Sequence, residues 1–281
     1  MDRESDPRII PAARGRGEPD QLEVCAAAAR AGGRVLAGWR GRFGVSQKGR
    51  RDLVTEADIA AQREIRRIVL SAFPDHGFVG EESLPEAETP AVAPGGLRWI
   101  VDPLDGTTNY VHGFPAYCVS VALARGDEIL VGAIYDPERD ECFTARAGGG
   151  AFLDDRPIRT GAATDPDDAL VAISFPPHVT ADSGAVADFL AVVPHVHSVR
   201  RTGSTAINLA YIACGRLDAF WVRRIASWDV AAGLLLVAEA GGAVGPFAGG
   251  PPGPPVLDRP VFIAAATAGL LAELQQILPP S

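Results

Sequence analysis

The sequence predicts a layered protein that mixes helices with β-sheets in two consecutive halves. Two amphipathic helices are expected first, then short β-branched runs separated by turn signals, and after about residue 150 strands alternate with helices. With 47% hydrophobic and 22% charged residues, a chain of 281 residues can bury a large core. We expect a loose, charged tail at 1–19, a first half with its own sheet at 20–150 and a second half at 151–281.

The first half begins with two predicted helices. Capping-box spacing and apolar residues at helical intervals predict the first from Asp20 to Trp39, although the glycine pair at 32–33 weakens its middle. The second is expected from Thr55 to Phe73, because a proline follows directly. Short apolar runs separated by turns then predict an antiparallel sheet of hairpins. These runs are Gly77–Gly80, Leu97–Val101, Tyr117–Ala124, Ile129–Asp136 and Glu141–Ala145.

The second half alternates strands and helices. Strands are expected at Leu170–Phe175, Leu217–Val222 and Val261–Ala265. Helices are expected at Ser204–Cys214, Ser227–Ala240 and Thr267–Leu278. The Gly/Pro-rich stretch Gly249–Pro255 predicts an irregular loop.

Charge and composition make several classes of function less favourable. The net charge of −9 and pI near 5.1 disfavour nucleic-acid and anionic membrane partners. Four scattered cysteines fit buried thiols in a reducing compartment, and with no visible signal peptide or membrane span we expect a cytoplasmic protein. The five histidines lack ligand spacing, and we interpret His195-x-His197 as a pair on one face of a strand.

The segment Trp99–Asn109, WIVDPLDGTTN, carries the strongest chemical signal. An apolar strand runs into Asp102 and Asp105, on either side of a proline-containing bend that can turn both carboxylates toward one point. Carboxylates held close repel, so one protonates unless a cation neutralises them, and their hard oxygens favour Mg²⁺, Mn²⁺ or Ca²⁺ over zinc. Exposed amides at Gly106 and Thr107 can hold an anion such as phosphate.

Each acidic position also has a purely structural interpretation. An isolated Asp-x-x-Asp-Gly is more often a turn after a strand, and Glu81 is also explained by a solvated loop. Asp229 stands in the first turn of a predicted helix, where the helix dipole favours an acid, and Asp58 has capping spacing behind Thr55. Their presence together at the ends of several elements favours a carboxylate-bridged metal site.

Four motifs in this order resemble the signatures of the inositol monophosphatase family. They are DLVTEAD at 52–58, GEES at 80–83, DPLDGTTN at 102–109 and WDVAAG at 228–233. The resemblance implies a sugar-phosphatase-like sandwich with alternating α-β-α-β-α layers, intermediate between the α+β and α/β classes. It also implies a magnesium-dependent, lithium-sensitive phosphomonoesterase that forms a homodimer.

The resemblance further implies a set of metal ligands. Glu81, Asp102 and the carbonyl of Leu104 would hold one Mg²⁺. Asp102, Asp105 and Asp229 would hold a second, and Glu81 would also face a weaker third ion.

The same resemblance implies the groups that act on phosphate and water. Thr107, paired with Asp58, would orient and deprotonate the attacking water, and the amides of Gly106 and Thr107 would cradle the phosphate. Elementary chemistry agrees, because phosphate monoesters hydrolyse extremely slowly without a catalyst and two cations can neutralise the developing charge. A threonine hydroxyl is a weak base and needs a carboxylate behind it.

Substrate choice is expected in the second half. Ser204 and Thr205 resemble the family segment that lines the sugar pocket, but either residue also suits a helix cap. Val222 stands where inositol monophosphatases usually carry a glutamate that binds a substrate hydroxyl. Arg223 and Arg224 follow directly, and they suit either a carboxylate or second phosphate on the ligand, or an ordinary charged surface.

These observations predict a Mg²⁺-dependent phosphatase for a small phosphorylated metabolite, nominally inositol monophosphate. Within the same chemistry, histidinol phosphate, fructose 1,6-bisphosphate and 3′-phosphoadenosine 5′-phosphate are alternative substrates. A hypothesis of another class is a regulatory scaffold that uses the fold to bind a macromolecule.

Overall fold

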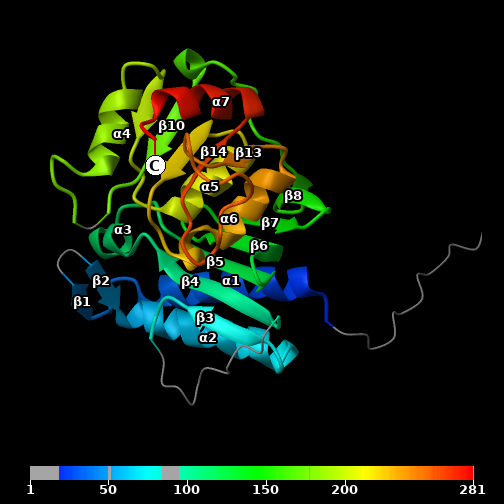
Figure 1. The fold of residues 1–281 in the computed structure, drawn as a ribbon. Coiled ribbons are helices and arrows are strands. Elements are labelled where there is room, and N and C mark those ends of the chain that lie inside the picture. Colours follow the sequence, from blue (N-terminus) through cyan, green and yellow to red (C-terminus); the bar gives the residue numbers. More distant parts are fainter. Residues whose placement is uncertain (1–18, 50–51, 84–94, 177, 281) are drawn as a thin grey trace, which may run out of the picture.

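The computed structural model describes residues 19–49, 52–83, 95–176 and 178–280, and within them the chain forms five alternating layers of helices and sheets (Figure 1). The layered α/β class and the alternation expected from the family resemblance are confirmed. None of the described helices is both long and apolar enough to cross a membrane. The tail predicted at 1–19 lies outside the described residues, except for its last residue.

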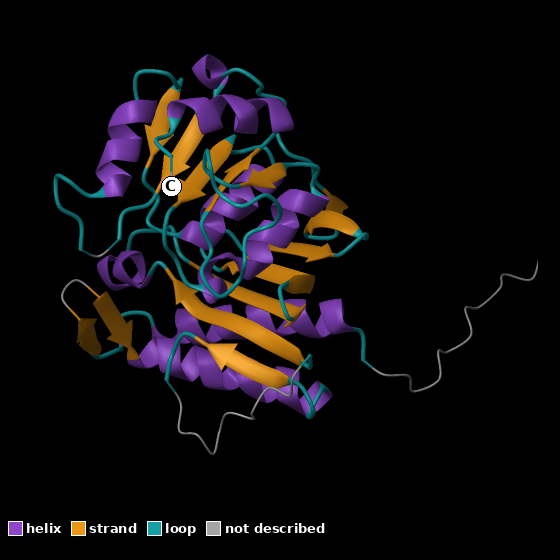
Figure 2. Cartoon of the chain, viewed as in Figure 1, coloured by secondary structure: helices purple, strands orange, loops and turns teal. Residues whose placement is uncertain are grey.

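Two long helices form the first layer, as expected. Helix α1 spans Gln21–Trp39, and the carboxylate of Asp20 caps it by accepting from the amides of its first turn. Helix α2 spans Glu56–Ala72 and begins with a capping box at Thr55. Both helices lie against the same face of the larger sheet (Figure 2).

The larger sheet has seven strands in chain order. They are β3 (Gly77–Gly80), β4 (Leu97–Asp105), β5 (Cys118–Arg125), β6 (Glu128–Asp136), β7 (Glu141–Arg146), β8 (Gly150–Leu153) and β9 (Arg156–Pro157). The predicted hairpins are confirmed from β4 onward, but β3 pairs parallel to β4. A parallel pair requires a long connection, which residues 81–96 supply.

Successive residues of this sheet point to opposite faces, so alternate residues pack into two different hydrophobic cores. On β5, Val119, Val121 and Leu123 pack toward α1 and α2, whereas Ala122 and Ala124 pack into the core on the opposite face. Both faces are therefore buried, which explains why these strands are apolar throughout rather than alternating with polar residues.

The opposite face is covered by the middle layer, helices α5 (Thr205–Ala213) and α6 (Ser227–Glu239), which also pack on a second sheet. That sheet has the order β11-β10-β12-β14-β13. Its strands are β10 (Leu170–Ile173), β11 (Ser198–Arg200), β12 (Ala219–Val222), β13 (Ala243–Gly245) and β14 (Phe262–Ala265). Helices α4 (Gly184–Val192) and α7 (Ala268–Ile277) cover its outer face.

Several elements were not expected from the sequence. They are the hairpin of β1 (Val45–Gly49) and β2 (Asp52–Thr55), the short helix α3 (Thr107–His112), helix α4, the 3₁₀ turn Pro166–Asp168 and the short strands β8, β9, β11 and β13. The strand interpretation of His195 and His197 is wrong, because both residues are exposed and lie in the turn before β11.

The glycine pair of α1 allows close packing rather than interrupting the helix. A Cβ at Gly33 would collide with the ring of Tyr135 on β6, and one at Gly32 would lie 2.8 Å from Ile65 of α2. The helix is continuous through both positions, since tertiary packing outweighs the low helix propensity of glycine.

We expect Gly33→Ala to destabilise the fold by about 1–3 kcal/mol, because the added methyl group forces the Tyr135 ring to move. Gly38 of the same helix is the matched control, since a Cβ there meets nothing within 4 Å. Gly38→Ala should stabilise the fold by about 0.5–1 kcal/mol through helix propensity. Urea unfolding measures both changes, and equal effects of the two substitutions would contradict this account.

Candidate active site

The end of β4 brings two carboxylates into one place. Asp102 pairs with Ser120 and Asp105 with Cys118, so β4 carries one residue more than β5 over this stretch. Such a bulge bends the strand and redirects side chains. The amide of Leu104 donates to Asp102 Oδ1 at 2.9 Å, which fixes the bend around Pro103.

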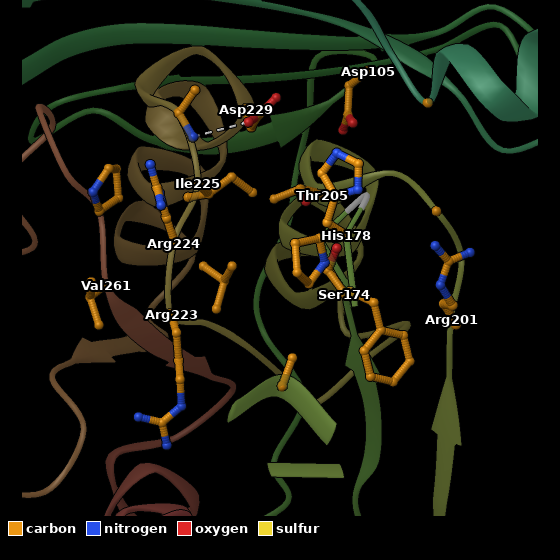
Figure 3. A pocket seen from close by; sticks show the side chains of 18 of the residues that line it. Asp105, Ser174, His178, Arg201, Thr205, Arg223, Arg224, Ile225, Asp229 and Val261 are labelled. Atoms are coloured by element: carbon orange, nitrogen blue, oxygen red, sulfur yellow. Dashed lines mark hydrogen bonds between the residues drawn. The ribbon is translucent and has the colours of Figure 1, made fainter. Parts of the chain in front are cut away.

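A third carboxylate reaches the same point from the middle helical layer. Asp229 lies in the first turn of α6, where its Oδ2 accepts from the amide of Ala226 at 3.2 Å (Figure 3). Asp102, Asp105 and Asp229 each place one carboxylate oxygen within 4.8 Å of those of the other two. Asp229 is therefore an acid in the first turn of a helix, as one interpretation held, and it also belongs to the cluster of carboxylates.

The cluster is held together against strong mutual repulsion. Burial raises the pKa of Asp105 to about 8, and the nearby charge of Asp229 adds to the shift. Burial likewise raises the pKa of Asp102 well above its usual value, with further contributions from Glu81 and Asp105. A divalent cation would remove this repulsion, and three carboxylates are a hard oxygen set that fits Mg²⁺, Mn²⁺ or Ca²⁺.

Residues of the middle layer hold Asp105 in position. Its Oδ2 accepts from the hydroxyl of Ser204 at 2.7 Å and from the amide of Ala206 at 2.6 Å. Ser204 also caps α5 through the amide of Ile207 and is buried. The cap interpretation of Ser204 is therefore correct, and the structure places it behind the carboxylate cluster rather than along the pocket.

Glu81 stands beside this cluster at the end of β3. Its amide donates to the carbonyl of Val101 at 3.1 Å, and its charge contributes to the raised pKa values of Asp58, Asp102 and Asp105. It is not among the three residues whose oxygens converge within 4.8 Å.

Gln62 of α2 fixes the turn that follows β3. Its side-chain amide donates to the carbonyl of Glu82 at 2.7 Å and accepts from the amide of Glu82 at 2.9 Å. Gly80 leaves room for this amide group, because a Cβ there would force the Gln62 side chain to move. Gln62 was not predicted as a site residue, since nothing in its local sequence pattern distinguishes it from an ordinary helical residue.

Asp58 accepts hydrogen bonds both from Thr55, at the start of α2, and from Thr107, the residue predicted to activate the attacking water. Its Oδ2 accepts from the amide of Thr55 at 2.9 Å and from the Thr55 hydroxyl. Its Oδ1 accepts from the hydroxyl of Thr107 at 3.3 Å, and that hydroxyl also lies 3.1 Å from the carbonyl of Leu104. Burial raises the pKa of Asp58, while the Thr55 hydrogen bonds oppose the shift. The capping and pairing interpretations of Asp58 therefore both apply.

The backbone after Asp105 turns sharply into α3. Gly106 adopts φ +98°, and a Cβ there would lie 2.9 Å from the carbonyl of Ala116. Gly106 and Thr107 line the same pocket as Asp105 and Asp229. Asn109, whose role was not foreseen, donates to the carbonyls of Ala116 at 2.6 Å and Thr202 at 2.8 Å and so ties α3 to the segment before α5.

The pocket continues from the carboxylates into the second half of the chain. Thr205 and Val222 line it, and both are largely buried. Arg223 borders it, but its guanidinium binds Asp188 of α4 at 2.7 and 2.8 Å and stacks over the ring of Phe247. Figure 3 shows this side chain pointing away from the carboxylates, so its charge is committed elsewhere.

Comparison with known proteins agrees with this geometry. A family model described as "Inositol monophosphatase family" matches residues 18–279. The inositol-1-monophosphatase of Rhizobium meliloti (strain 1021) is 46% identical over 199 residues, covering 70% of this chain and 73% of that protein. A protein named Nus factor SuhB from Xylella fastidiosa is 42% identical over 212 residues, covering 73% of each.

Solved structures show the same fold. The crystal structure of the extragenic suppressor protein suhB from Bartonella henselae superimposes with a TM-score of 0.82 at 37% identity, covering 92% of this chain and 97% of that one. The inositol monophosphatase from Anabaena superimposes with a TM-score of 0.78 at 33% identity, covering 92% and 96%. The chain therefore belongs to the inositol monophosphatase family and is a phosphoric monoester hydrolase.

Proposed function

We propose that the protein hydrolyses a small phosphate monoester with Mg²⁺ and a metal-activated water, with inositol monophosphate as the nominal substrate. The convergence of the Asp102, Asp105 and Asp229 carboxylates beside the Thr107–Asp58 pair carries the proposal. Buried like charges cost stability, and a metal-dependent reaction gives a reason to keep them.

The ligand assignment follows the family resemblance and fits the residues present. Glu81, Asp102 and the carbonyl of Leu104 would hold one Mg²⁺, and Asp102, Asp105 and Asp229 a second, with Glu81 facing a weaker third ion. Bound Mg²⁺ would lower the pKa of a water molecule and neutralise charge on the phosphate and the leaving oxygen. The raised pKa of Asp105, about 8, supports the assignment, because its causes are burial and the nearby charge of Asp229, which a bound cation would neutralise.

The chain's own groups position water and phosphate. The Thr107 hydroxyl donates to Asp58 Oδ1, which leaves its oxygen free to accept a hydrogen bond from the attacking water. Asp58 is the final acceptor of the proton, and burial raises its pKa toward the range useful for a base. The amides of Gly106 and Thr107 would hold the phosphate oxygens at the start of α3.

Val222 lacks the carboxylate that binds a hydroxyl of inositol, so histidinol phosphate, fructose 1,6-bisphosphate and 3′-phosphoadenosine 5′-phosphate stay as alternatives. We also propose a cytoplasmic, lithium-sensitive homodimer with no nucleic-acid or membrane partner. In this proposal, residues 20–150 supply most metal ligands and 151–281 most of the substrate pocket, with Asp229 completing the metal site from the second half.

A regulatory scaffold is the alternative of another class. Relatives named Nus factor SuhB at 42% and 36% identity favour it. The carboxylate cluster favours catalysis, because a scaffold has no need to gather three acids at one point. Phosphate release in the presence of Mg²⁺, and its loss with EDTA, distinguishes the two.

Asp105→Asn is expected to lower Mg²⁺-dependent phosphate release by several orders of magnitude, because it removes a charge shared by the cluster. Asp75→Asn makes the same chemical change at an exposed position outside the pocket and should leave the rate unchanged. Circular dichroism checks that both variants fold. Near-normal activity of Asp105→Asn would show that the second metal site is assigned wrongly.

Thr107 offers a conservative test of water activation. Thr107→Ser keeps the hydroxyl that donates to Asp58 and should retain most of the activity. Thr107→Val keeps the shape without the hydroxyl and should lower kcat by about 10²–10⁴-fold. Equal activity of the serine and valine variants would exclude the hydroxyl from the reaction.

The raised pKa of Asp105 makes the metal-free protein sensitive to pH. The folded state keeps a proton on Asp105 up to about pH 8, whereas the unfolded chain loses it near its usual pKa of about 4. The free energy of unfolding in EDTA should therefore fall as the pH rises through this window, and less so in Asp105→Asn. Mg²⁺ should offset the loss most strongly at the alkaline end, because it binds deprotonated carboxylates. A stability in EDTA that does not change with pH would contradict the buried-charge account.

A further inference from the structure

The pocket is larger than a single small phosphate ester requires. Its volume is about 1420 Å³, whereas pockets for drug-sized ligands are typically about 300–1,000 Å³. The carboxylates of Asp105 and Asp229 occupy one end, where the ester phosphate would bind (Figure 3). Most of the cavity therefore lies beyond the reacting phosphate and is available to the rest of the substrate.

Among the arginines that line this outer part, Arg201, Arg224 and Arg259 have no ion pair with a described residue, and Arg259 directly follows the acid Asp258. Arg201 follows β11 and Arg224 follows β12, and both are exposed and line the pocket. Across the part of the chain that the structure describes, neither has a hydrogen bond or ion pair, in contrast to Arg223, which is bound to Asp188. Figure 3 shows Arg201 and Arg224 on opposite sides of the pocket, with Arg224 extending toward the end where Asp229 lies.

The outer pocket offers few carboxylates to a neutral polyol. Val222 presents an apolar side chain that is 8% exposed. The acids among the pocket-lining residues are Asp105 and Asp229 at the metal end and Asp258 in the loop before β14. Donors with positive charge therefore predominate where the rest of the substrate would lie, and charged donors recognise phosphate or carboxylate better than hydroxyl groups.

We propose that Arg201 and Arg224 bind a second anionic group, so that the preferred substrates are phosphate monoesters carrying another phosphate or a carboxylate. The inference rests on the proposed function, because it takes the ester phosphate to lie at the carboxylate cluster. The anion-binding role that the sequence suggested for Arg223 or Arg224 thus falls to Arg224. Arg201, which directly follows β11, joins it from another part of the chain.

Matched substrate pairs test the preference directly. Fructose 1,6-bisphosphate is compared with fructose 1-phosphate, which lacks only the second phosphate. 3-Phosphoglycerate is compared with glycerol 3-phosphate, which replaces the carboxylate by an alcohol. The doubly anionic member should have a kcat/KM about tenfold higher or more in at least one pair, and the pair that responds identifies the second group. The preference should shrink as the ionic strength rises.

Single substitutions assign the preference to the two arginines. Arg201→Ala and Arg224→Ala should each lower kcat/KM for the doubly anionic member about tenfold and change it less than about twofold for its partner. Arg200→Ala is the matched control, because Arg200 neighbours Arg201 and carries the same charge but does not line the pocket. Melting temperatures should be unchanged in Arg201→Ala and Arg224→Ala, since neither side chain loses a hydrogen bond or ion pair to any described residue.

The outcomes separate this inference from the proposed function. If the singly phosphorylated compounds and inositol 1-phosphate are hydrolysed with Mg²⁺ but neither pair shows a preference, the inference is overturned and the proposed function stands. Equal losses for both members of a pair in the arginine variants also overturn it. If no compound is hydrolysed, the proposed function fails and the inference fails with it.

Discussion

The repulsion among three adjacent carboxylates, two of them buried and one partly buried, is the constraint on which the rest of the structure depends. Asp102, Asp105 and Asp229 come from two segments far apart in the chain, yet their oxygens converge within 4.8 Å. No local structure can hold such a group together. Three parts of the fold hold these carboxylates in place: the bulge of β4, the first turn of α6, and the hydrogen-bond donors Ser204 and Ala206 at the start of α5. Together they keep close the charges that would otherwise separate.

The five-layer arrangement provides these restraints. Helices α5 and α6 lie between two sheets, so their starting residues face the end of β4 while their apolar faces pack on both sides. On the other side of the larger sheet, α2 places Asp58 and Gln62 against the same edge. The candidate site is thus built where three consecutive layers meet, and rigid elements rather than loops hold its carboxylates.

Much of this architecture was predictable from the sequence, because its long helices and apolar strands have clear periodicity. The family and the layer order were confirmed, and the ordered motifs placed the acidic residues that the structure brings together. The parallel pairing of β3 with β4 was not predictable, since short apolar strands carry no sign of direction. Helix α4 was missed because its exposed apolar residues, such as Leu190, obscure the amphipathic pattern.

The roles of neighbouring arginines show where sequence reasoning stops. Arg223 and Arg224 are adjacent and chemically identical, yet only the structure reveals that Asp188 and Phe247 bind the first. Arg201 carried no signal at all, because its position in the pocket depends on β11 lying beside β10. Long-range packing decides which charge is free, and a single sequence does not encode that packing in any short motif.

The hydrogen bonds within the carboxylate cluster also bear on the size of the ion it selects. Asp102, Asp105 and Asp229 each have one oxygen engaged by a backbone amide, and in Asp105 that oxygen accepts a hydroxyl as well. Backbone donors therefore already engage part of the oxygen set that a cation would meet. Calcium commonly relies on bidentate carboxylates and high coordination numbers, whereas magnesium accepts single oxygens in an octahedron and retains several waters. A cation that needs few carboxylate oxygens would therefore suit this cluster better than one that needs many.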